Sequence, residues 1–137
     1  MIGISTKTVY AVAALYELGG GPAEKLMKIK EIARQTDISQ NFLEQILLEL
    51  KKSGFLLSVK GAHGGYRLAK PLSEILLKEI MMVLENDAFS SPCKTENPTL
   101  KLFWEEMNVE AETLFSVPLS QLYVCQQRAN NPLNYSI

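Results

Sequence analysis

The stretch SGFLLSVKGAHGGYRLAKP at residues 53–71 decides the fold of this chain. Residues 55–59 (FLLSV) are mostly apolar and predict a strand, and residues 66–69 (YRLA) predict a returning strand that Pro71 ends. Between them, residues 61–65 form a glycine-rich tip, where glycine permits positive φ and lets the backbone approach a phosphate closely. The stretch therefore predicts a β-hairpin with a tight, open tip.

Basic residues concentrate around this hairpin. Residues 1–70 carry ten Lys/Arg and six Asp/Glu, whereas residues 71–137 carry four and nine. The window 51–70 holds five basic residues and no acidic one, and two of them, Lys60 and Arg67, flank the tip. Such a window is typical of a surface that meets a polyanion, although a solvated basic face would give the same pattern.

Two short helices are predicted directly before the hairpin. One spans about 28–35, a turn follows at 36–38, and Ser39 caps the next helix, which Gly54 ends. The core face of the capped helix is apolar and consists of Leu43, Ile46, Leu47 and Leu50. Helix, turn, helix and basic hairpin in this order predict a winged helix-turn-helix, so the fold class is mainly α with a small β wing.

Helices also flank this unit on both sides. Ser5 can cap a first helix that begins at Thr6, and residues 19–22, Gly-Gly-Gly-Pro, end it. Helical spacing predicts that its buried face is formed by Val9, Val12, Ala13 and Tyr16. After the hairpin, Ser73 is expected to cap a fourth helix that runs to Leu84.

The second half of the chain predicts a dimerisation module. A polar loop at 86–98 precedes a long helix over 99–116, and a short helix follows Pro118. A monomer would expose the apolar face of the long helix unless that helix folds back on its own winged helix; a two-fold homodimer would cover it. This face consists of Leu100, Phe103, Trp104, Met107, Ala111, Leu114 and Phe115.

We therefore divide the chain into four parts. We expect residues 1–85 to form a winged helix-turn-helix domain of the DNA-binding kind and residues 86–98 a sensor-type loop. We expect residues 99–128 to form dimerisation helices and residues 129–137 a flexible tail.

Candidate contacts to double-stranded DNA come from the first helix, the helix capped by Ser39, and the hairpin. Gln and Asn can pair bidentately with adenine, Glu can accept from cytosine, and wing cations meet phosphates or the minor groove. The alternative is a solvated helix or hairpin surface, but their place in the motif favours contact with DNA. The candidates are Lys7, Tyr10, Ser39, Gln40, Asn41, Phe42, Glu44, Gln45, Lys60, Gly61, His63, Gly64, Gly65, Tyr66 and Arg67.

Other site classes find little support. The two cysteines, Cys93 and Cys125, are far apart, and His63 is the sole histidine, so neither a structural metal site nor a catalytic constellation is expected. We expect Cys125 to be buried, and Cys93 in its loop is a candidate redox sensor. No apolar run reaches the length of a membrane span, and no signal peptide is visible; we expect a cytoplasmic protein without membrane contact.

Three motifs resemble one known family. They are Ser5-Thr6-Lys7 with Tyr10-Ala11, the segment 38–46 (ISQNFLEQI), and the segment 61–68 (GAHGGYRL). They resemble the Rrf-type family of winged helix-turn-helix transcription regulators, over about residues 1–125. The resemblance implies a dimer with a long cross-subunit helix that regulates transcription in iron–sulfur, redox or cysteine metabolism.

The chain departs from that family at the cluster site. Many members hold a 2Fe-2S cluster with three cysteines in the loop before the long helix, but here the loop keeps only Cys93. Lys101 stands where some members have a histidine ligand, and Lys60 replaces the wing arginine. A cluster needs about four soft ligands, so we expect no cofactor, with a 2Fe-2S cluster as the less favoured alternative.

The chain end resembles that of the family's cysteine-metabolism repressor, which also lacks the cluster cysteines. Tyr135 and Ile137 are candidate docking residues for cysteine synthase, although a frayed terminus would look the same. The sequence thus predicts a homodimeric, sequence-specific DNA-binding regulator, with repression expected. The alternative is a protein-interaction module that regulates an enzyme such as cysteine synthase and binds little DNA.

Overall fold

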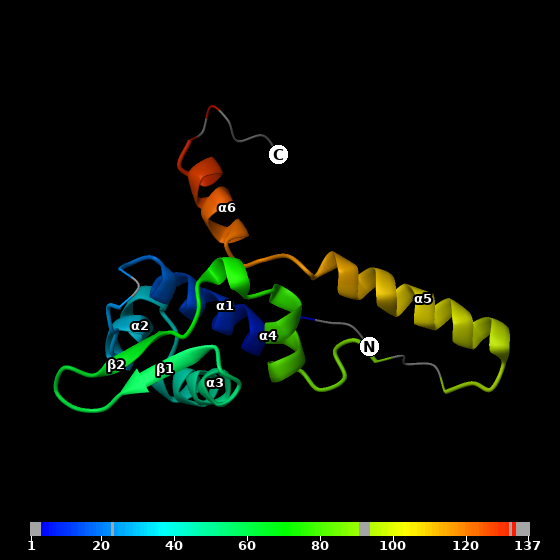
Figure 1. The fold of residues 1–137 in the computed structure, drawn as a ribbon, viewed down its shortest axis with the longest axis horizontal. Coiled ribbons are helices and arrows are strands. Elements are labelled where there is room, and N and C mark those ends of the chain that lie inside the picture. Colours follow the sequence, from blue (N-terminus) through cyan, green and yellow to red (C-terminus); the bar gives the residue numbers. More distant parts are fainter. Residues whose placement is uncertain (1–3, 23, 91–93, 132, 134–137) are drawn as a thin grey trace.

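The computed structural model describes residues 4–22, 24–90, 94–131 and 133. Within them the chain is mainly helical and carries one two-stranded antiparallel sheet (Figure 1). The predicted fold class is therefore confirmed. The elements are α1 Thr6–Gly19, α2 Ile29–Thr36, α3 Gln40–Lys52, β1 Leu56–Val59, β2 Gly65–Leu68, the 3₁₀ helix η1 Leu72–Glu74, α4 Leu77–Leu84, α5 Pro98–Leu114 and α6 Gln121–Ala129.

One hydrophobic core joins the four helices α1 to α4 and the hairpin. The buried face of α3 is the predicted one, since Leu43, Ile46, Leu47 and Leu50 are all fully buried. Leu15 of α1, Ile32 of α2 and Ile80 of α4 meet them in the same cluster. The core therefore fixes how α3 lies relative to the hairpin.

The buried face of α1 differs from the predicted one. Ser5 does cap the helix, and its Oγ accepts from the Thr8 N–H at 3.5 Å. Val9, however, is 54% exposed, and Val12, Ala13 and Tyr16 are only half-buried. Apolar residues lie on most sides of this helix, so their spacing could not predict which side packs against the core. The buried residues are Thr8, Ala11, Ala14, Leu15 and Leu18.

The prediction of a continuous fourth helix capped by Ser73 is wrong. The short 3₁₀ helix η1 ends at Glu74, and Ile75 and Leu76 are extended before α4 begins at Leu77. The extended pair bonds to the segment between α5 and α6: the Leu119 N–H donates to the Ile75 carbonyl at 2.8 Å. The Leu77 N–H likewise donates to the Val117 carbonyl at 2.8 Å. Tertiary pairing has thus overridden local helical spacing.

Helix α5 projects away from the body, with its N-terminal end outermost (Figure 1). Its start is well capped, because the Asn97 Oδ1 accepts from the Thr99 and Leu100 N–H groups at 2.9 and 3.3 Å. Pro98 fits the first helical position, where no amide hydrogen is needed. No residue of α5 is buried, so this helix gains little from packing on its own chain.

Helix α6 leaves the body beside η1 and carries the chain toward its C-terminus (Figure 1). Leu119 is buried against the core, and Leu122 and Tyr123 pack on it partly. Cys125 is exposed, which contradicts the expectation of a buried thiol, since only the first turn of α6 reaches the core. Among the described residues, no helix has the length and apolarity to cross a membrane.

Candidate nucleic-acid interface

The outer face of α3 presents a row of polar side chains. Ser39 caps the helix as predicted, with its Oγ accepting from the Phe42 N–H at 3.3 Å. Because the opposite face of α3 is buried, the polar row must point outward: Gln40, Asn41, Glu44 and Gln45 are all exposed. A helix held this way by its apolar seam can lie in a DNA major groove, where such side chains read base edges.

Helix α1 supports the first turn of α3 from behind. The rings of Tyr10 and Phe42 meet edge to face, with centroids 5.2 Å apart. The Lys7 ammonium pairs with the Glu49 carboxylate at 2.7 Å, which ties α1 to the far end of α3. Lys7, Tyr10 and Phe42 are therefore placed at the α1–α3 contact, where they orient the polar row.

The wing is a four-residue ladder with an open tip. β1 pairs with β2 from Leu56 opposite Leu68 to Val59 opposite Gly65. At the tip, Lys60 and His63 are exposed, and Gly61 adopts φ +111° with open space around it. Arg67 is half-buried on β2, opposite Leu57. The structure thus places Lys60 at the exposed tip of the wing and Arg67 further back on β2.

Gly64 and Gly65 serve the packing of the hairpin. A Cβ on Gly64 would lie 2.0 Å from the Val59 carbonyl oxygen. A Cβ on Gly65, which has φ +151°, would lie 2.6 Å from the Met27 carbonyl oxygen. Tyr66 exchanges backbone hydrogen bonds with Met27 at 2.8 and 2.9 Å, so a third segment joins the wing at β2. These three residues hold the wing against the helices.

A basic cavity between α2 and the wing tip was missed by the sequence analysis. It has a volume of about 580 Å³ and is lined in part by Lys28, Lys30, Arg34 and His63. The Lys28 ammonium donates to the Ala62 carbonyl at 2.6 Å. The spacing of Lys30 and Arg34 on one face of α2 was the available signal, because cations at i and i+4 form one patch on a helix.

Leu48 was also missed on the outer face of α3. It is 49% exposed and stands one turn beyond Glu44, on the same side of the helix. The apolar spacing assigned its neighbour Leu47 to the core and left Leu48 without a role. An exposed aliphatic side chain in that row can contact a thymine methyl group.

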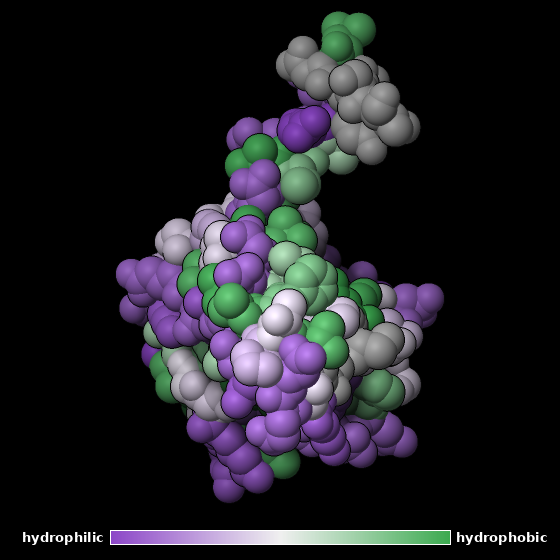
Figure 2. Space-filling view, turned by 90° about the vertical axis from the view of Figure 1, so that its right-hand side faces the viewer, coloured by the Kyte–Doolittle hydropathy of each residue, from purple (hydrophilic) through white to green (hydrophobic). Residues whose placement is uncertain are grey.

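The predicted dimerisation residues lie along one exposed stripe of α5. Leu100, Phe103, Trp104, Met107 and Leu114 are between 37% and 73% exposed. Ala111 belongs to the same stripe, while Phe115 follows the helix and packs against Phe89 at 6.1 Å between ring centroids. Figure 2 looks onto the end of the molecule from which α5 projects and shows apolar side chains gathered among polar ones.

The sensor and docking candidates fall elsewhere. Cys93, Tyr135 and Ile137 lie outside the described residues. Within the part of the chain that the structure describes, no three His, Cys, Asp or Glu side chains come together in a way that would hold a metal ion.

Comparison with known proteins agrees with this geometry. Residues 4–123 match the family model described as Rrf2, iron-dependent transcriptional regulator. Protein rrf2 of Nitratidesulfovibrio vulgaris is 33% identical over 69% of this chain and 63% of its own length. The transcriptional regulator CymR of Bacillus subtilis is 32% identical over 87% of this chain and 88% of its own length.

Solved structures give the same result. The structure titled as CymR, the global cysteine regulator of B. subtilis, superposes with a TM-score of 0.75 at 30% identity, covering 89% of this chain and 96% of that one. The IscR structure from T. potens has a TM-score of 0.73 at 28% identity, and the match covers 99% of this chain and 93% of that one. The chain spans less than two thirds of the length of the first curated relatives it matches. With its winged helix and a family match over most of its length, the chain belongs to the Rrf2 family of transcriptional regulators.

Proposed function

We propose that this protein is a transcription regulator that binds a specific duplex DNA sequence as a homodimer. The observation that carries the proposal is the exposed polar row of α3 beside a basic wing. Gln40, Asn41, Glu44 and Gln45 supply hydrogen-bonding groups for base edges. Lys60 and Arg67 supply the charge for the phosphate backbone, which dominates affinity without specifying sequence.

The dimer is proposed from α5. Its stripe repeats at offsets of 3, 4, 7, 11 and 14 residues from Leu100, which keeps six apolar positions on one side of the helix. So much exposed apolar surface on a projecting helix is costly in water, and self-association covers it symmetrically. A two-fold axis would also present two α3 helices to DNA, at a spacing of about one helical turn, roughly 34 Å, or a multiple of it.

The test is binding of the full-length protein to genomic fragments, followed by footprinting of the fragment that is retained. We expect the footprint to cover an inverted repeat. We also expect the logarithm of the binding constant to fall linearly with the logarithm of salt concentration. Equal affinity for all fragments, or no binding at low salt, would contradict the proposal. In that event, a regulator acting through protein contacts alone would become the better reading.

We propose further that the protein holds no 2Fe-2S cluster of its own and is not an enzyme. The donor set does not fit a cluster: the loop at 86–98 has one cysteine, and Lys101 and the exposed Cys125 do not complete a thiolate set. Iron and sulfide analysis of anaerobically purified protein tests whether a cluster is bound. Stoichiometric iron and sulfide, lost in Cys93→Ala, would overturn it.

Docking of the C-terminus on cysteine synthase remains a separate proposal. It rests on the residues Tyr135-Ser136-Ile137, whose tyrosine and isoleucine side chains are candidates for a small apolar docking pocket. The similarity to CymR, titled a global cysteine regulator, supports it. Calorimetry with cysteine synthase should show binding that O-acetylserine competes away and that deletion of Ile137 abolishes.

A further inference from the structure

A cavity of about 590 Å³ lies where the wing, the end of α1 and the start of α6 meet. Its walls are largely aliphatic, with Leu18, Leu68, Pro71 and Leu72 among them. Leu18 and Leu72 belong to the buried core, so this part of the wall is firmly held. A concave, mostly apolar site with a few polar groups is the usual form of a small-molecule pocket.

The charged side chains that line this cavity are all basic. Arg67 and Lys70 both line the cavity, and no aspartate or glutamate does. The ion pairs among the described residues are Lys7–Glu49 and Lys78–Glu112, so neither cation of the cavity has an acidic partner there. The Lys70 ammonium instead lies 5.0 Å from the centroid of the buried Phe55 ring.

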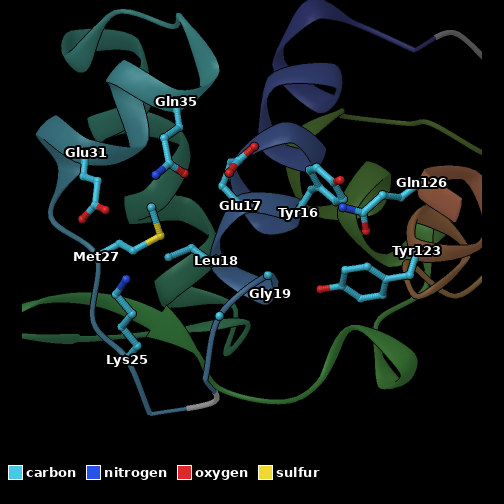
Figure 3. Close-up of a pocket in the computed structure, with 12 residues that line it drawn as sticks. Tyr16, Glu17, Leu18, Gly19, Lys25, Met27, Glu31, Gln35, Tyr123 and Gln126 are labelled. Atoms are coloured by element: carbon cyan, nitrogen blue, oxygen red, sulfur yellow. The ribbon is translucent and has the colours of Figure 1, made fainter. Parts of the chain in front are cut away.

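Hydroxyl groups complete the polar side. Ser73, Ser120 and Tyr123 line the cavity at its border with η1 and α6. The Tyr123 hydroxyl points toward Gly19 (Figure 3) and lies so close that a Cβ on Gly19 would be 2.5 Å from it. The Tyr123 phenol is protonated at neutral pH and can donate a hydrogen bond, and burial, with a smaller contribution from Tyr16, raises its pKa further.

A neighbouring cavity shows the opposite charge. It has a volume of about 570 Å³ (Figure 3). It shares Leu18, Gly19, Gly21 and Tyr123 with the first. Its lining, however, includes Glu17 and Glu31 against Lys25 alone. An anion is therefore favoured in the first cavity and disfavoured in the second, and the two serve as matched sites of similar size.

We propose that the cavity beside Arg67 binds a small organic acid with an apolar body. The carboxylate pairs with Arg67 and Lys70, and the apolar body lies against the aliphatic wall formed by Leu18, Pro71 and Leu72. Because Arg67 is also a wing cation, the bound acid competes with DNA phosphate for it. This second half rests on the proposed function, whereas the site itself does not.

The first experiment uses full-length protein without DNA. The probes are phenylacetate, 4-methylpentanoate and octanoate, each compared with its neutral amide by ligand-observed NMR and calorimetry. We expect saturable binding of an acid that is at least about tenfold tighter than binding of its amide, because a charge-assisted pair is lost in the amide. Absence of charge-dependent binding for all three acids would overturn the proposal.

Variants locate the site. Lys70→Gln should weaken acid binding by about tenfold or more. Glu31→Gln, in the neighbouring cavity, should leave it unchanged. Since Lys70 also packs on Phe55, thermal unfolding of Lys70→Gln checks its fold, and Ser73→Trp offers an independent block by filling the cavity from its exposed rim. Acid binding that survives both Lys70→Gln and Ser73→Trp would place it elsewhere and refute the assignment.

The second experiment adds DNA. Saturating acid should weaken binding to the footprinted fragment in wild-type protein and have a much smaller effect in Arg67→Gln, where the shared cation is already gone. Acid that binds without changing DNA affinity would overturn the competition. Failure of the protein to bind any DNA would refute the proposed function and leave the result of the first experiment standing.

Discussion

The ammonium of Lys28 donates a hydrogen bond to the carbonyl of Ala62 at 2.6 Å and so links the start of α2 to the tip of the wing. The residues are 34 positions apart, and no other side-chain hydrogen bond among the described residues reaches the tip. Besides the shared core, the wing is therefore hydrogen-bonded to the start of α2 here and to the segment before α2 at the Met27–Tyr66 backbone pair. The position of the tip relative to α3 depends on both.

Replacing Lys28 with Met should loosen the tip. Met keeps most of the aliphatic stem but removes the donor, so the amides of Ala62 and His63 should gain fast motion while those of β1 stay rigid. Backbone ¹⁵N relaxation measures this directly. Lys30→Met, on the same helix without such a bond, is the control, and equal relaxation in both variants would show that the hydrogen bond does not restrain the tip.

Gly64→Ala should destabilise the hairpin strongly. The new Cβ would lie 2.0 Å from the Val59 carbonyl oxygen, so the ladder must open at its last pair. We expect a loss of about 2 kcal/mol or more in the free energy of unfolding, measured with urea. In Gly20→Ala the nearest atom would be 3.6 Å away, at the Glu17 carbonyl. That variant should stay within about 0.5 kcal/mol of wild type, and similar losses in both would contradict the steric argument.

The wing and α3 should make different contributions to DNA binding. Lys60→Ala and Arg67→Ala each remove one cation, so each should weaken binding to all sequences. Each should also reduce the slope of log affinity against log salt concentration by about one. Gln45→Ala should instead change sequence preference, because it should reduce the discrimination between bases at the contacted position by about 1–3 kcal/mol. Fluorescence anisotropy over a salt series and an operator library separates the two effects. Lys94→Ala, in the loop before α5, should change neither.

Charge introduced into the α5 stripe should break the dimer. Phe103 and Trp104 stack edge to face at 5.2 Å and are both exposed in the single chain. Phe103→Glu with Trp104→Glu places two carboxylates where the partner's apolar side chains would lie, so sedimentation should show a monomer that remains folded. Thr113→Glu adds a charge to the opposite side of α5 and should stay dimeric. A monomeric wild type at micromolar concentration would refute the interface.

Local patterns predicted the parts of the fold that short-range chemistry determines. The Ser39 cap, the seam of α3 from Leu43 to Leu50 and the hairpin around its glycines are all as expected, because each depends on neighbours in sequence. These same residues are what the family resemblance rests on. The polar row of α3 then follows, since burying one face of a helix exposes the other.

Long-range contacts account for what the sequence did not predict. Ile75 and Leu76 have good helical neighbours, yet they pair with the segment after α5 and stay extended. The Lys28–Ala62 bond and the cavity beside Arg67 each join segments more than 30 residues apart, so no local pattern marks them. Val9 is exposed because α1 is apolar almost all round, and only the packed partners decide which side is inward.

The last prediction concerns the Tyr123 phenol, whose pKa burial raises above the ordinary value of 10.0. A raised pKa in the folded state means that folding favours the protonated phenol. Its contribution to stability is therefore complete below pH 10 and is lost as the pH rises from there through the pKa of the folded protein.

Ultraviolet difference absorbance across an alkaline titration should show a tyrosine component that ionises above the ordinary phenol pKa of 10.0, and Tyr123→Phe should remove that component. Thermal unfolding measured over the same range should fall less steeply with pH in Tyr123→Phe than in wild type. Tyr10→Phe is the control, since Tyr10 lies on the opposite, α3-facing side of α1 and pairs with Phe42 instead. If the late component survives in Tyr123→Phe, then the Tyr123 hydroxyl is solvated, and α6 does not close against Gly19 in solution.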